Sequence, residues 1–269
     1  MNQKLIALDL DGTTLNQAGT LSPQTIATLQ AAQTAGHLVV IATGRPDSIS
    51  EHFYDELGLT APMINFNGAL IHKPHQHWGG ERQVALTTQT ALALKSLKTQ
   101  FDIELMVAEG KQLLLADHGY VNMPFLPDLP DPQSLFDADG LTQAPISVTM
   151  FIREHTLTAL QQAVAQHFPS LTPKTWGAWS GEHTALEVTE GNTSKSQAVA
   201  YVAGLYGIDQ ADVIAFGDDL NDLDLIDYAG VGVAMKNARP EILQAANAVT
   251  AFDNENSGMA DYLADYLAL

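Results

Sequence analysis

Short apolar runs alternate along the N-terminal part of the chain with segments whose apolar positions recur at helical spacing. Serine, proline and glycine mark the expected starts and ends of the helices. The predicted elements are a strand at 5–8, a helix from Ser22-Pro23 to about Ala35, a strand at 38–42, a helix from Pro46, and a strand leading to a turn at Asn67-Gly68. This alternation predicts parallel βαβ units.

The pattern changes at about residue 82, where strands begin to follow one another. The predicted elements are a strand near 82, a helix near 88–99, strands near 103–107 and 111–115, a proline-rich loop at 122–132, a strand at 146–152, a helix at 156–167, and strands near 171–176 and 184–189. Strands that are neighbours along the chain and separated by few helices are typical of an α+β module.

The first pattern returns after about residue 190. The predicted elements are helices at 194–206, from about 219, at 239–246 and at 258–267, with strands at 212–216 and 231–234. The sequence therefore predicts an α/β protein: a doubly wound, Rossmann-like parallel-sheet core made of residues 1–82 and 190–269, interrupted by an inserted α+β domain at 83–189.

Charge and composition exclude several classes of protein. The formal net charge is −19 with only 12 Lys and Arg, so we expect no nucleic-acid partner, because phosphate neutralisation needs a basic surface. No apolar run reaches membrane-spanning length and no secretory signal is evident, so we expect no membrane partner. The chain has no cysteine, which fits a reducing compartment. We expect a cytoplasmic protein, either a monomer or a weak homodimer.

Three of the buried strands in the predicted core run directly into polar clusters. The first precedes Asp9 and Asp11, the second precedes Thr43-Gly44-Arg45, and the third precedes the sequence GDDLND at 217–222. Ligands of open parallel sheets bind outside the carboxyl ends of the strands. We therefore expect the three clusters to converge at one site.

Four carboxylates would then crowd a small space, namely Asp9, Asp11, Asp218 and Asp222. Asp218 and Asp222 are spaced to share one face of a helical turn with Asn221. Several carboxylates this close cannot all ionise without a counter-charge. A hard divalent cation prefers oxygen ligands, and Mg²⁺ suits an incomplete carboxylate set. The residues therefore predict a Mg²⁺ site.

Four segments together resemble the motifs of the haloacid dehalogenase-like (HAD) phosphatases: DLDGTTL at 9–15, ATGR at 42–45, Lys195 in TSKSQAV, and GDDLND at 217–222. NGALI at 67–71 and GVAMKNA at 232–238 are similar to the Cof-like subfamily, whose large type IIB cap is inserted between the second and third motifs. Residues 83–189 fall in that gap. Ser196 and Glu190 depart mildly from the family pattern, and neither departure removes a functional group.

The resemblance implies the roles of the catalytic residues. Asp9 would be the nucleophile that forms an aspartyl-phosphate, and Asp11 would protonate the leaving oxygen and then activate water. Mg²⁺ would be held by Asp9, the backbone carbonyl of Asp11, and Asp218. Asp222 would support the metal shell and Lys195.

The resemblance also implies a set of groups around the substrate. Thr43 and Lys195 would be catalytic by binding phosphoryl oxygens, Gly12 would let the backbone approach the phosphate, and Asn221 would support the site. The full substrate-binding set is Gly12, Thr43, Gly44, Arg45, Lys195 and Asn221.

The function implied is Mg²⁺-dependent hydrolysis of small-molecule phosphate monoesters, with sugar phosphates as the first candidate. Phosphorylated cofactors such as pyridoxal or flavin phosphate are the alternative, and a non-catalytic phosphate-binding protein is the alternative from another class. The segment 175–184 carries Trp176, Trp179 and His183. These residues either face the substrate or form the core of the inserted domain.

Overall fold

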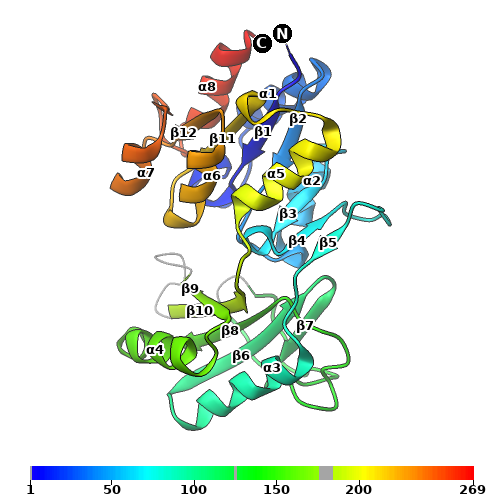
Figure 1. The fold of residues 1–269 in the computed structure, drawn as a ribbon, viewed down its shortest axis with the longest axis vertical. Coiled ribbons are helices and arrows are strands. Elements are labelled where there is room, and N and C mark those ends of the chain that lie inside the picture. The colour runs from blue at the N-terminus through cyan, green and yellow to red at the C-terminus, as the bar shows by residue number, and fades with distance from the viewer. Residues whose placement is uncertain (1, 124–125, 176–183) are drawn as a thin grey trace. The chain divides into compact units, whose positions relative to one another are not determined.

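The computed structural model describes residues 2–123, 126–175 and 184–269. The chain forms two compact units. The first comprises Met1–Arg45, Ser50–Arg82 and Thr193–Leu269, and the second comprises Pro46–Ile49 and Gln83–Asn192. Figure 1 colours the first unit blue to cyan and yellow to red, and the inserted segment mainly green.

The first unit is built on a five-stranded sheet in the order β13-β12-β11-β1-β2. All neighbouring strands in this sheet run parallel. Its strands are β1 (Leu5–Leu8), β2 (Leu38–Ile41), β11 (Val213–Gly217), β12 (Val231–Ala234) and β13 (Ala248–Val249). The predicted α/β class with a parallel-sheet core is confirmed.

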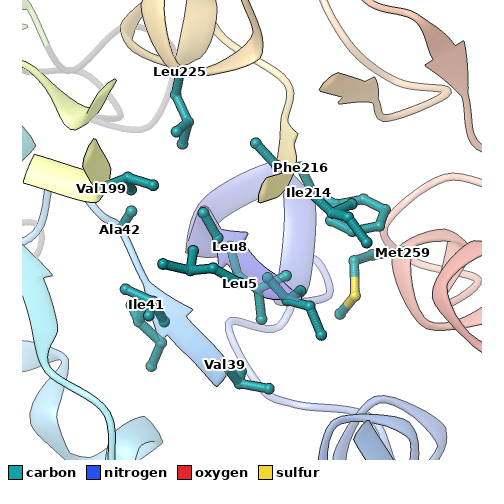
Figure 2. Close-up of a cluster of buried hydrophobic side chains, with 14 of the residues drawn as sticks. Leu5, Leu8, Val39, Ile41, Ala42, Val199, Ile214, Phe216, Leu225 and Met259 are labelled. Atoms are coloured by element: carbon teal, nitrogen blue, oxygen red, sulfur yellow. The ribbon is translucent and has the colours of Figure 1, made fainter. Parts of the chain in front are cut away.

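Helices connect and cover these strands. They are α1 (Pro23–Thr34), α2 (Glu51–Glu56), α5 (Lys195–Tyr206), α6 (Leu223–Tyr228), α7 (Pro240–Ala245) and α8 (Gly258–Leu267). Figure 2 shows strand side chains packed with Val199 of α5, Leu225 of α6 and Met259 of α8. Every residue of β1 and β2 is buried, as expected for strands covered on both faces.

A small three-stranded sheet completes this unit. It consists of β3 (Met63–Asn65), β4 (Leu70–His72) and β5 (Arg82–Gln83). β3 and β4 are antiparallel and are joined by a tight turn at Phe66–Gly68. The chain leaves the first unit within β5.

The second unit is an antiparallel sheet in the order β7-β6-β8-β10-β9. The elements are α3 (Thr88–Leu94), β6 (Ile103–Gly110), β7 (Leu113–Ala116), β8 (Ser147–Ile152), α4 (Leu157–His167), β9 (Leu171–Thr175) and β10 (Thr184–Glu190). Leu94 of α3 and Leu160 of α4 share one apolar cluster with Met106 and Val148 of the sheet, so both helices cover the same face. Trp176, Trp179 and His183 lie outside the described residues.

The structure differs from the expected elements at several places. The helix expected from Pro46 is a 3₁₀ turn at Asp47–Ile49 followed by α2. The helix expected near 88–99 ends as α3 at Leu94 and continues as a 3₁₀ turn. In the described part of the chain, no helix has both the length and the apolar composition needed to cross a bilayer.

Candidate active site

Asp9 follows β1 directly and is buried, with 5% of its surface exposed. The chain then turns through Gly12, whose φ of +70° lies in the left-handed region that favours glycine. A Cβ at this position would lie 2.2 Å from Oδ2 of Asp218. Gly12 therefore lets the loop after β1 approach Asp218 closely, as no other residue could.

Lys195 is the first residue of α5, and its side chain is fully buried. The hydroxyl of Ser194 caps this helix by accepting the N–H of Gln197. Nζ of Lys195 lies 2.6 Å from Oδ1 of Asp9 and 2.6 Å from Oδ1 of Asp222. A buried ammonium is stable only when it is paired, and here the lysine joins the loop after β1 to the loop after β11.

Asp218 and Asp222 lie in the turn that follows β11. Oδ2 of Asp222 accepts the backbone N–H groups of Asp218 at 3.0 Å and Asp219 at 3.2 Å. Oδ1 of Asp218 accepts the hydroxyl of Thr13 at 3.0 Å. Asp222 thus braces the turn and holds Lys195, whereas Asp218 is tied to the loop after β1.

The electrostatics of this cluster follow from burial and mutual repulsion. Burial, reinforced by the charge of Asp222, raises the pKa of Asp9 well above its usual range. The same two causes raise the pKa of Asp218 to about 7. Burial alone would lower the pKa of Lys195, but the carboxylates of Asp222 and Asp9 raise it above its usual value. Lys195 therefore stays charged, but its single positive charge is too little to neutralise Asp9, Asp218 and Asp222 together.

A bound metal cation would reduce the repulsion among these carboxylates. Asp9, Asp218 and Asp222 each offer one carboxylate oxygen, and these atoms lie within 4.8 Å of one another. A set of carboxylate oxygens, two of them on the acids with raised pKa values, Asp9 and Asp218, fits a hard divalent ion such as Mg²⁺. The donor chemistry therefore fits the metal that the sequence predicted, with Asp9 and Asp218 as the residues least committed to other partners.

Asp11 is placed differently from the other three acids. Its Oδ2 accepts Nε of Arg45 at 2.7 Å, and its Oδ1 accepts Nη2 at 2.5 Å. The guanidinium also lies 5.6 Å from the centre of the Phe53 ring. Arg45 therefore binds the side chain of Asp11, and Asp11 is not among the residues whose carboxylate oxygens are grouped closely enough to hold a metal ion.

Thr43 and Gly44 follow β2, the strand that pairs with β1. Thr43 is 1% exposed, and its Oγ1 accepts the backbone N–H of Arg45 at 3.1 Å. A Cβ on Gly44 would come within 3.2 Å of the carboxamide of Asn67. Asn221 donates from Nδ2 to Oδ1 of Asn67 at 3.0 Å.

Three residues take part in the site although the sequence suggested no role for them. Thr13 contacts Asp218, Asn67 contacts Asn221, and Nδ2 of Asn237 donates to the backbone oxygen of Gly12 at 2.8 Å. All three stand inside the segments that carried the family resemblance. Their position in those segments was the signal by which the sequence could have indicated a role for them.

Comparison with known proteins points to the same family that the sequence motifs resemble. A family model described as haloacid dehalogenase-like hydrolase matches residues 6–263. The 5-amino-6-(5-phospho-D-ribitylamino)uracil phosphatase YitU of Bacillus subtilis is 30% identical, over 98% of both chains. The pyridoxal phosphate phosphatase YbhA of Escherichia coli is 28% identical, over 99% of this chain and 100% of that one.

Solved structures share the fold. A haloacid dehalogenase-like hydrolase from Bacteroides thetaiotaomicron superposes with a TM-score of 0.85 at 20% identity, covering 98% of this chain and 100% of that chain. The HAD subclass IIB sugar phosphatase BT4131 superposes with a TM-score of 0.78 at 20% identity, covering 99% and 100%. The family match spans nearly the whole chain, and the resemblance seen in the sequence is confirmed: the chain belongs to the haloacid dehalogenase-like hydrolases.

Proposed function

We propose that this hydrolase is a Mg²⁺-dependent phosphatase that cleaves small-molecule phosphate monoesters through an aspartyl-phosphate on Asp9. The observation that carries the proposal is the buried link from Asp9 through Lys195 to Asp222, with Asp218 beside it. A nucleophilic carboxylate that is held by a buried lysine ammonium at the end of a parallel strand is suited to phosphoryl transfer.

In the first half-reaction, a carboxylate oxygen of Asp9 attacks phosphorus and the bond from phosphorus to the ester oxygen breaks. Protonated Asp11 gives its proton to that oxygen, so the alcohol leaves neutral. Lys195 and Thr43 bind phosphoryl oxygens, which stabilises the charge that develops on them. Gly12, Gly44, Arg45 and Asn221 complete the proposed binding set.

In the second half-reaction, Asp11 is a carboxylate and takes a proton from water. The water oxygen attacks phosphorus, the bond to Asp9 breaks, and inorganic phosphate leaves. Mg²⁺ bound by Asp9, the backbone carbonyl of Asp11, and Asp218 would neutralise charge on the phosphoryl group. Asp222, which the sequence also predicted as a ligand, holds Lys195 and the turn after β11.

We further propose that residues 83–189 determine which ester is accepted. Sugar phosphates are the first candidate class. Phosphorylated cofactors and their precursors are the second, and the names of two relatives favour them, one acting on a phosphoribitylamino-uracil and one on pyridoxal phosphate. A purely binding function is disfavoured because every charged motif residue is present.

The decisive experiment is a screen of the purified chain against p-nitrophenyl phosphate and a panel of sugar and cofactor phosphates with Mg²⁺. We expect hydrolysis that stops after exhaustive EDTA treatment and returns with Mg²⁺. Full activity after EDTA would contradict the metal assignment, and no hydrolysis of any ester would contradict the phosphatase. A cytoplasmic location and a monomeric or weakly dimeric state stay predictions.

A further inference from the structure

The turn between β3 and β4 has an unusual backbone. Phe66, Asn67 and Gly68 have φ values of +50°, +53° and +100°, so three successive residues occupy the left-handed region. Asparagine and glycine tolerate this region, but a buried phenylalanine does not do so readily. Strained backbone of this kind persists only where the surrounding contacts enforce it, and it gathers at functional sites.

The contacts that enforce this turn come from three parts of the candidate site. The backbone N–H of Asn67 donates to the oxygen of Thr43 at 3.0 Å, and that of Phe66 donates to the oxygen of Arg45 at 3.2 Å. Gly68 packs so closely on the residue before Lys195 that a Cβ there would lie 2.3 Å from the oxygen of Ser194. The turn therefore lies against both the segment after β2 and the start of α5.

The side chain of Asn67 supplies the third connection. It is 6% exposed, and its carboxamide packs on Gly44, where an added Cβ would lie 3.2 Å from it. Its Oδ1 accepts Nδ2 of Asn221, which is next to Asp222 in the turn after β11. A single carboxamide thus joins the segment proposed to bind phosphoryl oxygens to the segment that carries the acids.

We propose that Asn67 is a positioning residue of the active site, which fixes Asn221 and the turn after β11 relative to Thr43 and Gly44. The inference rests on the proposed phosphatase function. Asparagine suits this position because it accepts a hydrogen bond and also tolerates a positive φ. A catalytic group displaced by about 1 Å can cost 100-fold in rate, so a link between two halves of a site has a large effect without touching the substrate.

The test separates the carboxamide from the backbone conformation. Asn67→Gly removes the acceptor but adopts the positive φ without strain, whereas Asn67→Ala removes the acceptor and adds backbone strain. Asn122→Ala is the matched control, because Asn122 is exposed and has a φ of +55°. Each variant is assayed for p-nitrophenyl phosphate hydrolysis across a Mg²⁺ titration, together with its melting temperature.

We expect kcat/KM to fall about 10- to 100-fold in both Asn67 variants, the scale known for residues that orient ligating groups. Asn67→Gly should melt at or above Asn67→Ala, and Asn122→Ala should keep wild-type activity. The double variant Asn67→Ala with Asn221→Ala should lose no more than the worse single variant. Near wild-type kcat/KM in Asn67→Gly would show that only the backbone conformation matters. Additive losses in the double variant would show that the two side chains act separately. Either result overturns the proposal.

A binding measurement keeps this test independent of turnover. Inorganic phosphate with Mg²⁺ is titrated calorimetrically into the wild-type protein and into Asn67→Gly. We expect the variant to bind phosphate several-fold more weakly at equal Mg²⁺, and equal affinity would count against the positioning role. If the wild type binds phosphate but hydrolyses no ester, the proposed function fails while the inference about Asn67 is still decided by this comparison.

Discussion

The guanidinium of Arg45 binds both carboxylate oxygens of Asp11, with Nε 2.7 Å from Oδ2 and Nη2 2.5 Å from Oδ1. The two side chains are 15% and 29% exposed, so the pair lies at the edge of the site and is partly screened by solvent. Because both oxygens accept hydrogen bonds from Arg45, Asp11 must leave the guanidinium before it can give a proton to a substrate. The paired state is therefore a resting arrangement in the proposed mechanism.

Replacing Arg45 by lysine should lower kcat/KM by about 10-fold, because Arg45 belongs to the proposed substrate-binding set and an ammonium cannot bind a phosphate in the bidentate manner of a guanidinium. Steady-state kinetics on p-nitrophenyl phosphate would measure this loss. Arg153→Lys is the control, since Arg153 is half exposed and pairs with Glu104 of the second unit. Equal losses in both variants would mean that Arg45 has no specific role in the reaction.

Asp9→Asn should abolish turnover, with a loss of at least about 1,000-fold, because a carboxamide cannot form the acyl-phosphate. The fold should persist, since the substitution removes one of several mutually repelling acids and leaves Asp222 to pair Lys195. Kinetics and circular dichroism would be measured on the same sample. A folded variant with near wild-type activity would show that the nucleophile is another residue.

Asp11→Asn should also be severely impaired, but the loss should depend on the leaving group. Esters of acidic alcohols such as p-nitrophenol need little protonation, whereas alkyl phosphates need a proton from Asp11. We therefore expect a smaller loss of the first half-reaction for p-nitrophenyl phosphate, measured as a pre-steady-state burst. A loss that is equal for good and poor leaving groups would argue against the acid role.

Mg²⁺ should bind more tightly as the pH rises from 6 to 8. Burial and the charge of Asp222 raise the pKa of Asp218 to about 7, so at pH 6 this proposed ligand holds a proton that the metal must displace. The half-saturating Mg²⁺ concentration should fall over this range, measured by calorimetry to avoid the pH dependence of turnover. A constant value would place the metal on groups that are already ionised at pH 6.

The second unit should lose stability at alkaline pH because of a buried acid. Glu109 of β6 is 2% exposed, and burial followed by repulsion from Glu187 raises its pKa from a usual 4.5 to about 8. The folded state therefore favours protonated Glu109. The resulting stability is fully present below pH 4.5 and is lost as the pH rises through 8.

Glu109→Gln should remove this dependence, because glutamine resembles the protonated acid. Since each unit of pKa shift corresponds to about 1.4 kcal/mol, the variant should melt several degrees higher than wild type at pH 9 and similarly at pH 5. Exposed Glu154 on the same unit supplies the control variant Glu154→Gln. An unchanged melting temperature at pH 9 would mean that Glu109 ionises without cost.

The strands and the main catalytic candidates could be predicted from local patterns. Four-residue apolar runs identified β1 and β2, and the acids that follow β1 and β11 identified where the candidate site lies. The pairing of Arg45 with Asp11 was not predictable, because it depends on how two loops 34 residues apart meet. The positive φ of Phe66 was equally hidden, since phenylalanine carries no local signal for that conformation.

Other differences arose where tertiary contacts override local preference. The helix expected from Pro46 starts only at Glu51, because Ser50, with φ −135° and ψ −15°, is not helical and separates the 3₁₀ turn at Asp47–Ile49 from α2. β13 is two residues long and too short to produce a pattern. The burial of Glu109 and Glu187 could not be predicted from the sequence, because acidic residues in a strand are expected on the solvent face.

The order of strands in the core has a consequence for how the chain is made. β1 is the central partner of β2 and β11, and the 110 residues Gln83–Asn192 separate the two parts of its sheet. The inserted segment is continuous and leaves the ribosome before β11 does, so it can fold while the core sheet is still incomplete. Lys195 cannot meet Asp222 until β11 and the turn that follows it have been synthesised. The site is thus assembled only after the inserted segment has been made, and a product truncated before β11 would carry Asp9 without Asp218 and Asp222.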